Sequence, residues 1–461
     1  MNALILLSGL GVFTLLAEIF RLRKFLVPIV MLALLGVFAA NITEWNHTKS
    51  YYNDMMLVDN FAVAFTGLLV FVSFLWMFLA KPYFENGENR ADRLALVVFA
   101  LVGAVVMVSY ANLTMLFLGI EILSISMYIL AGSRKSDKHS NEAAFKYFLM
   151  GAFATAFLLL GIAFIYGAAG SFHLSKIAEY AQAMPADTAG FFYAGILLML
   201  VGLAFKVSAV PFHFWVPDVY EGSPHEVTAF MSTVVKTAAI AAFFRLFSTC
   251  FTTLSPSWTT VLWILSALTI LVGNITAVYQ TNLKRMLAYS SISHAGYMLI
   301  AILAMNKLSA GAIFYYAAAY SLSSLAIFAV LIEVDRVKGN SDMRSFAGLA
   351  ANNPLLAFMG TVAMLSLSGI PPAAGFFAKY YIFTAAIQQG YVWLVAVAIL
   401  GSLIGVYYYF RFIVEAYRPA PMQVATDAAT PTIFVKVLLF ITFALTLFLG
   451  IFPELAIRLL N

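Results

Sequence analysis

The chain consists of about fourteen long apolar stretches joined by short polar segments, and this succession limits what it can fold into. A helix needs about 20 apolar residues to cross the roughly 30 Å of hydrocarbon in a bilayer. Hydrophobic residues make up 63% of the sequence and charged residues only 10%, whereas soluble domains carry roughly 25% charged residues. We therefore predict an all-α polytopic membrane protein without a soluble domain. The predicted helices cover residues 3–20, 26–43, 57–79, 93–110, 112–132, 142–167, 189–213, 225–250, 258–279, 284–305, 309–333, 353–386, 391–417 and 432–457.

The basic residues fall on alternate connections, which orients the predicted helices. Cytoplasmic loops are enriched in lysine and arginine. With an even number of spans, both termini are expected on the non-cytoplasmic side of a bacterial inner membrane. Of the 26 basic residues, the cytoplasmic set is Arg21, Arg23, Lys24, Lys81, Arg90, Arg93, Arg134, Lys135, Lys138, Lys146, Lys284, Arg285, Arg336, Lys338, Arg344, Arg411 and Arg418. The opposite side holds only Lys49, Lys176, Lys307 and Arg458.

Cysteine content excludes several kinds of redox chemistry within the chain. Cys250 is the only cysteine, so the sequence offers no internal disulfide and no set of thiolates for an iron–sulfur cluster or a structural zinc. No site for NADH or FMN is visible either. The first apolar stretch lacks a basic leading region, so we interpret it as a retained span and not as a cleaved signal peptide.

Two apolar runs are too long and too interrupted to be simple helices. The run 189–213 ends in VPF, and the run 353–386 is broken by LSGIPPAAGFF. Proline removes a backbone donor and clashes with the preceding turn, and non-helical backbone at membrane depth is tolerated only beside protein or water. Lys206 lies five residues before the first proline, and Lys379 lies seven residues after the last one. Paired broken helices of this kind indicate an internal repeat with an ion site at each break.

Four charged residues lie deep inside predicted helices: Glu121 and Lys236 halfway along theirs, and Lys206 and Lys379 beside the breaks. A charge at the bilayer centre costs a few kcal/mol on insertion scales, so its default interpretation is functional. Two structural alternatives stay open. Glu121 and Lys236 could form ion pairs with other buried groups, and the two lysines at the breaks could satisfy carbonyl groups that the prolines free.

Two further polar residues are candidates for proton transfer. His294 lies inside its predicted helix in the hydroxyl-rich sequence YSSISHAGYM, where a histidine and serines can hold water and pass protons. A packed, hydrogen-bonded histidine is an equally simple explanation. Lys146 lies near the cytoplasmic end of its helix and could be an interfacial anchor. Glu18, Arg245 and Lys436 lie close to helix ends, where their charges can reach the interface.

The segment PFHFWVPDVYEGSPHEVTAF gathers several residues of metal-ligating type. Their spacing matches no compact metal motif, so we interpret the segment as a wet, acidic mouth beside the lysines. The residues are His213, Asp218, Glu221, His225 and Glu226.

A glutamate and three lysines at mid-depth in neighbouring helices predict a proton relay. Their titrations become coupled, because burial disfavours a charged lysine and a nearby carboxylate favours it. One unit of pKa corresponds to about 1.4 kcal/mol, and one charge crossing 100 mV requires about 2.3 kcal/mol. A change of about two to three units in the pKa of a buried lysine would therefore match the membrane potential. We therefore expect Lys206 to carry protons, with the break at Pro211 letting water reach it.

Four longer stretches carry a family resemblance: GLAFKVSAVPFHFWVPDVYEGSP, TAFMSTVVKTAAIAAFFRLF, GNITAVYQTNLKRMLAYSSISHAGYM and MLSLSGIPPAAGFFAKYYIF. From about Asn112 to Tyr417 the chain resembles the subunit N family of the proton-pumping NADH:quinone oxidoreductases, or respiratory complex I. The resemblance implies fourteen helices with two inverted five-helix repeats, each containing a broken helix. It implies 1–92 as three N-terminal helices, 93–250 and 251–418 as the repeats, and 419–461 as the last helix.

The resemblance also implies roles for individual residues. Glu121 and Lys206 match a modulating pair, Lys236 a central relay, and Lys379 a group connected to the exit side. His294 and Lys146 match polar positions of the family's hydrophilic axis.

The loop after the first break distinguishes this chain from related subunits and, at one point, from its own family. Sister subunits and cation/proton antiporter subunits have a histidine-containing loop where this chain has VPDVYEGSP. Within its own family the chain also departs after GSP, where His225 and Glu226 stand in place of the usual small residue and proline.

The resemblance implies partners as well. Other complex I membrane subunits, including antiporter-like neighbours, a peripheral NADH-oxidising arm and the lipid bilayer are expected around the chain, with FMN, iron–sulfur clusters, NADH and quinone on partner subunits. No cofactor, metal or nucleic acid is expected on this chain itself. Two other functions stay open: a subunit of a multisubunit cation/proton antiporter, and a purely structural scaffold whose buried lysines are incidental.

Overall fold

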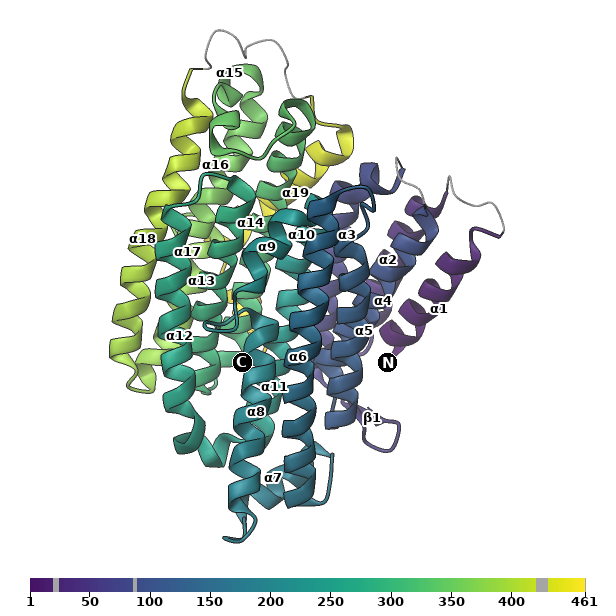
Figure 1. The fold of residues 1–461 in the computed structure, drawn as a ribbon, viewed down its shortest axis with the longest axis vertical. Helices are drawn as coiled ribbons and strands as arrows, with labels where there is room; N and C mark the ends of the chain where they lie inside the picture. Colours follow the sequence, from purple (N-terminus) through teal and green to yellow (C-terminus); the bar gives the residue numbers. More distant parts are fainter. Residues whose placement is uncertain (20–24, 86–88, 420–429, 461) are drawn as a thin grey trace.

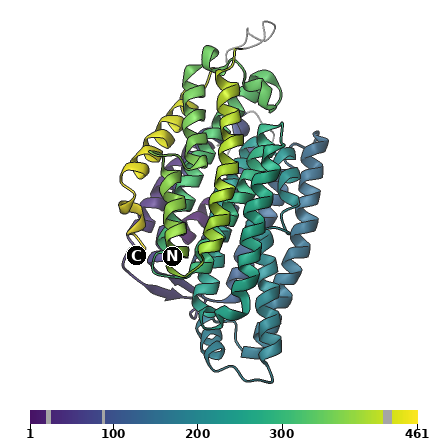
Figure 2. The same cartoon turned by 90° about the vertical axis from the view of Figure 1, so that its left-hand side faces the viewer.

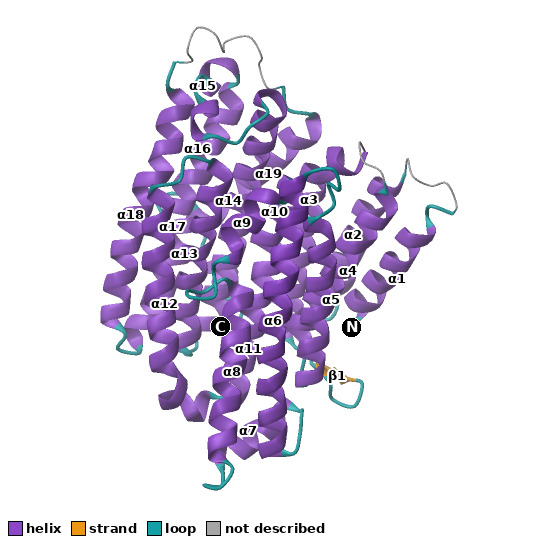
Figure 3. Ribbon diagram, in the orientation of Figure 1, coloured by secondary structure: helices purple, strands orange, loops and turns teal. Residues whose placement is uncertain are grey.

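The computed structural model describes residues 1–19, 25–85, 89–419 and 430–460 and forms one bundle of helices that run mostly along its long axis (Figures 1 and 2). Nearly every described segment is helical (Figure 3). Arg21, Arg23 and Lys24, which we assign to a cytoplasmic loop, lie outside the described residues.

The helices confirm the predicted succession of spans. Eleven described helices are long and apolar enough to cross a membrane, and three shorter apolar helices are Asn2–Leu16, Leu26–Ile42 and Pro354–Ser368. Together they give the fourteen helices that the sequence predicts. The elements are α1 (Asn2–Leu16), α2 (Leu26–Ile42), β1 (Lys49–Tyr51), β2 (Met56–Val58), α3 (Asn60–Glu85), α4 (Arg90–Ser109), α5 (Leu113–Ala131), α6 (Lys138–Ala169), α7 (Leu174–Gln182), α8 (Ala189–Val207), α9 (Trp215–Gly222), α10 (His225–Phe230), the π-helical turn η1 (Met231–Val235), α11 (Lys236–Cys250), η2 (Thr252–Leu254), α12 (Ser255–Val278), α13 (Leu283–Ala304), α14 (Ser309–Lys338), η3 (Met343–Phe346), α15 (Leu349–Asn352), α16 (Pro354–Ser368), α17 (Ala374–Gln388), α18 (Val392–Tyr417), α19 (Ile433–Ile451) and α20 (Glu454–Ile457).

Four short elements were not expected from hydropathy: β1, β2, α7 and α20. β1 and β2 pair antiparallel around a turn in which Tyr52, Asn53 and Asp54 all have positive φ. The amphipathic helix α7 lies between two spans, and the last apolar run ends at Ile451 before the short α20. In Figure 1, β1 and α7 lie at the end opposite α15.

Each predicted break is present, and the two breaks have the same backbone design. α8 ends at Val207, Ser208 takes the left-handed conformation, and the chain passes Pro211 before α9 begins. α16 ends at Ser368, and Gly369 takes the left-handed conformation before Pro372 and α17. This ending closes the last helical turn with a hydrogen bond back from beyond the cap.

Backbone pairings recur between the two halves of the chain. Asn112 pairs with His173 in an isolated bridge, and Asn282 pairs with Asp342 in another. Both asparagines cap the helix that follows by accepting a backbone N–H. The second pairing lies about 170 residues further along, and it joins α13 to the end of α14 as the first joins α5 to the end of α6. These pairings fit the expected repeats 93–250 and 251–418, whose boundaries stay predictions.

The helix α11, which carries Lys236, and the helices α13 and α14 are the most deeply buried of the bundle. The most apolar stretch of the span His225–Cys250 is completely buried, and those of α13 and α14 are almost as deeply covered, whereas α6, α18 and α19 expose most of one side. α1 and α18 lie at opposite edges of the bundle in Figure 1. Four of the predicted site residues are surrounded by protein, so their partners must come from neighbouring helices: Lys206, Lys236, His294 and Lys379.

Candidate functional site: a line of buried amines

Lys206 is buried in the last turn of α8, just before the first break. Its Nζ donates to Ser124 Oγ of α5 at 2.7 Å and lies 3.4 Å from the Tyr128 hydroxyl, one turn further along. These partners are hydroxyl groups, which can both accept and donate a proton. Lys206 is thus bonded to groups that can pass a proton on.

Glu121 lies on the same helix as the partner of Lys206. It is half-buried, and its Oε1 accepts a hydrogen bond from Thr155 Oγ1 of α6 at 2.9 Å. Ser124 follows it by three residues, so the two side chains share one face of α5. No direct ion pair joins Glu121 to Lys206 in the part of the chain that the structure describes. The structure places the two predicted partners in one neighbourhood but leaves Ser124 between them.

Lys236 is buried at the start of α11, immediately after the π-helical turn Met231–Val235. Its Nζ donates to the Ser291 carbonyl of α13 at 2.6 Å and also contacts the Ser291 hydroxyl. The Tyr220 hydroxyl of α9 lies 3.4 Å from that same hydroxyl. Ser291 therefore connects the central lysine to the helix beyond the first break.

His294 lies one turn beyond Ser291 on α13 and is buried. Its Nδ1 lies 2.6 Å from the Tyr316 hydroxyl, and its Nε2 lies 3.0 Å from the Tyr409 hydroxyl. Tyr409 also meets Ser290 Oγ at 2.5 Å. Both ring nitrogens are bonded to hydroxyl groups, so a proton entering at one nitrogen can be replaced by one leaving at the other.

Lys379 is buried in the second turn of α17, after the second break. Its Nζ donates to the Ser368 carbonyl and to Ser402 Oγ of α18, both at 2.8 Å. It also lies 5.2 Å from the centre of the Tyr297 ring, within range of a cation–π interaction.

The helix α13 ties these groups together. Ser291, His294 and Tyr297 follow each other at intervals of three residues and therefore lie along one face. Ser291 meets Lys236, and Tyr297 meets Lys379. The structure thus brings Lys236, His294 and Lys379 into one line, while Glu121 and Lys206 form a separate group on α5 and α8.

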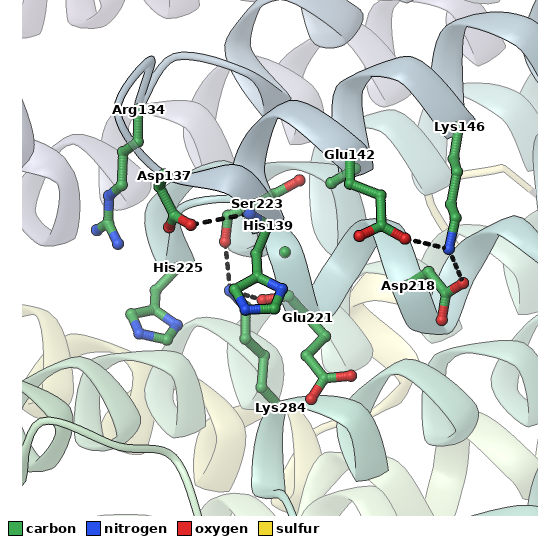
Figure 4. Close-up of a pocket in the computed structure, with 12 residues that line it drawn as sticks. Arg134, Asp137, His139, Glu142, Lys146, Asp218, Glu221, Ser223, His225 and Lys284 are labelled. Carbon is green, nitrogen blue, oxygen red and sulfur yellow. Dashed lines mark hydrogen bonds and ion pairs between the residues drawn. The ribbon is translucent and has the colours of Figure 1, made fainter.

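Lys146 does not join this buried line. Its side chain is 38% exposed and pairs with Glu142 Oε1 and Asp218 Oδ2, both at 2.7 Å. Asp218 Oδ1 also pairs with Arg285, which pairs in turn with Glu221. This network lines a cavity of about 350 Å³ at the end of α9 (Figure 4). The acidic mouth inferred from the sequence is therefore made of ion pairs.

No group of three or more His, Cys, Asp or Glu side chains is placed to hold a metal ion within residues 1–19, 25–85, 89–419 and 430–460. Two of the metal-type residues, Asp218 and Glu221, pair with Arg285 instead. His225 pairs with Asp335 of α14, 110 residues away in the sequence.

Sequence reasoning missed two buried basic residues. Lys284, which we place at the cytoplasmic end of the predicted helix 284–305, is 3% exposed and donates to the Glu221 carbonyl at 3.1 Å and to the Ser223 carbonyl. Arg245, assigned to the interface, is buried and pairs with Asp59 at 2.6 Å. Lys284 lies beside Arg285 at the start of a helix, and two adjacent basic residues in that position are typical of an exposed helix end. Only the carbonyls at the end of α9 explain its burial.

Comparisons with known proteins agree with this arrangement. A family model described as NADH:quinone oxidoreductase/Mrp antiporter, TM, matches residues 111–405. A curated relative from Cytophaga hutchinsonii, NADH-quinone oxidoreductase subunit N, is 46% identical over 100% of this chain and 99% of its own length. Another of the same name from Flavobacterium johnsoniae is 45% identical over 100% of both chains. This chain belongs to the subunit N family.

Solved structures extend the comparison to the whole fold. A chain of respiratory complex I from Thermus thermophilus with bound aureothin matches this chain with a TM-score of 0.84 and 32% identity, over 99% of this chain and 98% of that one. A chain of the Mrp complex from Dietzia sp. matches with a TM-score of 0.86 at 20% identity, over 99% of this chain and 96% of that one. The second likeness is one of fold alone.

Proposed function

We propose that this chain is the proton-translocating membrane subunit of an NADH:quinone oxidoreductase, and that its buried amines carry the protons. The observation that supports this most is the bonding of three buried lysines to hydroxyl groups of neighbouring helices. Relatives named NADH-quinone oxidoreductase subunit N, similar over their full length, support the reaction in which it takes part.

The residues take successive roles in this proposal. Glu121 and Lys206 form the group that is loaded or released, acting through Ser124 and Thr155. Lys236 receives the proton at Ser291, the start of the line along α13. His294, bonded at both ring nitrogens, passes it on, and Lys379 delivers it toward the exit side.

Lys146 serves the cytoplasmic mouth in this proposal. Its ion pairs with Glu142 and Asp218 place it at the edge of the cavity and not between the buried amines. Exposed ion pairs contribute little to stability, so a role for Lys146 would concern the delivery of protons to the mouth.

The electron-transfer chemistry belongs to partner subunits. NADH oxidation, quinone reduction, FMN and iron–sulfur clusters are assigned to the peripheral arm and its junction with the membrane, and this chain is assigned no redox centre. Other membrane subunits and lipid would cover the exposed faces of α6 and α18. The protein is a multi-pass inner-membrane protein, and we place both termini on the non-cytoplasmic side because basic residues cluster in the opposite connections.

The test is a Lys206→Met substitution in the complete complex, assayed in inverted membrane vesicles for NADH oxidation and for proton uptake. Methionine keeps the length of the side chain but cannot bind a proton. We expect proton uptake per NADH to fall several-fold, whereas Lys436→Met, an exposed lysine of α19, leaves it unchanged. Undiminished uptake in Lys206→Met would exclude the proposed role. Sodium-dependent uptake without NADH oxidation would favour the antiporter.

A further inference from the structure

A charged cavity opens at the end of α9, away from the buried line of amines. Its volume is about 350 Å³, and residues of the α5–α6 connection, α6, α9, α10 and α13 surround it (Figure 4). Its outer wall is the exposed network around Lys146, and its inner wall includes Lys284, which is 3% exposed. The cavity therefore reaches from the surface to buried polar groups.

His225 stands at this inner wall, at the first position of α10. Its Nε2 lies 2.9 Å from Asp335 Oδ2 of α14, and Asp335 Oδ1 accepts from Ser341 Oγ at 3.1 Å. Bonding at Nε2 assigns the ring proton to that nitrogen in the neutral form, since Asp335 can only accept when ionised. The other nitrogen, Nδ1, then keeps a free lone pair.

Three buried polar atoms in this region have no hydrogen-bond partner among the described residues: Ser223 Oγ, His225 Nδ1 and Glu226 Oε2. Arg134 approaches Glu226 Oε2, but only to 3.9 Å. Buried polar atoms of native proteins are nearly always bonded to protein or water, and water occupies cavities that offer several polar groups. Two of these atoms belong to residues that line the cavity, and a water molecule in the cavity would be the nearest partner for them.

Several polar groups lie between this wall and the central lysine. Lys284 donates to the carbonyls of Glu221 and Ser223, and Ser291 follows Lys284 on α13 after seven residues, which is two turns or about 10 Å. Ser291 holds Lys236, and the hydroxyl of Tyr220, the neighbour of Glu221, lies 3.4 Å from Ser291 Oγ. Polar groups of α9 and α13 therefore lie between the cavity wall and Lys236, and Glu121 and Lys206 are not among them.

We propose that His225, paired with Asp335, is a proton-loading residue at the inner wall of this cavity, and that it supplies Lys236 directly from cytoplasmic water. The inference rests on the proposed function above. A proton from the cavity binds the lone pair of Nδ1, the charge of Asp335 balances the imidazolium, and the same proton leaves Nδ1 for Lys236 through Ser291 when that lysine has released its own. No covalent bond other than N–H or O–H changes.

Charged groups face His225 from every side. Asp335 of α14 is its partner, Lys284 of α13 and Arg134 of the α5–α6 connection oppose a positive charge on it, and Glu226 follows it on α10. Asp137 and His139 complete the cavity wall on the α6 side. A loading residue matters most when cytoplasmic protons are scarce.

The experiment measures NADH-driven proton uptake by inverted vesicles containing the whole complex, with the pH of the cytoplasmic face varied from about 6 to about 8. His225→Gln introduces an amide, whose N–H can bond Asp335 but which does not titrate. We expect uptake equal to the wild type at the acidic end and about threefold lower at the alkaline end. Asp335→Asn should shift the profile in the same direction, and His47→Gln, an exposed histidine at the opposite end of the bundle, should not.

The outcomes separate the two proposals. A wild-type pH profile in both His225→Gln and Asp335→Asn would overturn the loading role, even where Lys206→Met abolishes uptake. An equal loss at every pH in both variants would also overturn it, because a structural defect does not depend on proton supply. Wild-type vesicles that oxidise NADH without taking up protons would overturn the proposed function itself. Rates are expressed per mole of assembled complex, so reduced assembly does not imitate a loss of uptake.

Discussion

The two broken helices share one backbone design but place their lysines on opposite sides of the break. In α8 and α9 the helix ends with Ala209 N–H bonded to the Ala204 carbonyl at 2.8 Å. In α16 and α17 the matching bond runs from Ile370 N–H to the Leu365 carbonyl at 3.0 Å. Lys206 precedes its break, whereas Lys379 follows the other. Seven residues after the first proline, where the second break has Lys379, the chain has Asp218 instead.

The difference lies in what satisfies the carbonyls at the end of the first half-helix. At the second break, Lys379 itself donates to the Ser368 carbonyl. At the first break, the indole of Trp215 donates to the Phe205 carbonyl at 3.3 Å, and Lys206 donates only to hydroxyl groups. Lys379 therefore combines a structural and a titrating role, while Lys206 is free of the structural one.

The largest effect is expected where the second break packs most tightly. A methyl group on Gly375 would overlap the backbone carbonyl of Ser366, which lies in the last turn of α16. We expect Gly375→Ala to destabilise the subunit by about 3 kcal/mol or more, because backbone would have to move. The measurement is the amount of subunit retained in the complex after mild detergent extraction. Gly190→Ala, with no atom within 4 Å of the added methyl, is the control. Equal retention of the two variants would contradict the close packing.

Lys379→Met should lower stability more than Lys206→Met does. It leaves the buried Ser368 carbonyl without its donor, which costs about 1–3 kcal/mol, whereas Lys206→Met frees only hydroxyl groups that can turn to other partners. We expect a lower temperature of half-inactivation of NADH:quinone activity for Lys379→Met alone, although both variants lose proton uptake. Identical inactivation temperatures would show that the two lysines do not differ in their structural role.

The smallest effect is expected from removing one hydroxyl partner at a time. Ser124→Ala removes the 2.7 Å partner of Lys206, and a neutral hydrogen bond contributes about 1 kcal/mol, or about fivefold in rate. Ser402→Ala should reduce uptake less, because Lys379 keeps the Ser368 carbonyl. Initial rates of proton uptake at saturating NADH measure both. A greater loss in Ser402→Ala would reverse the assignment of the two breaks.

Hydropathy and proline positions predict most of this fold, because a membrane helix can be recognised from the apolar residues of its own segment. Each of the fourteen predicted spans has a described counterpart, and both breaks occur where the sequence places them. Lys206, Lys236 and Lys379 are recognisable because a charge stands out in an apolar run. All three are buried, as we expect for a site.

The partners of the buried charged residues cannot be predicted from the sequence, because they come from distant helices. His225 and Asp335 are 110 residues apart, and Arg245 and Asp59 are 186 residues apart. Nothing in the sequence near Lys284 shows that the end of α9 lies against it. Ion pairs across a bundle depend on which faces of the helices meet, and uniformly apolar helices do not reveal those faces.

The π-helical turn Met231–Val235 gives the central lysine a property that ordinary helices lack. A π turn carries one residue more than the α-helix around it, so α10 and α11 are joined with one residue of slack. Passing that residue along would turn Lys236 about 100° around the helix axis and shift it about 1.5 Å. Ser291 would then face a different side chain. A shift of the π turn by one residue would therefore break the contact of Lys236 with α13 without moving either helix as a whole.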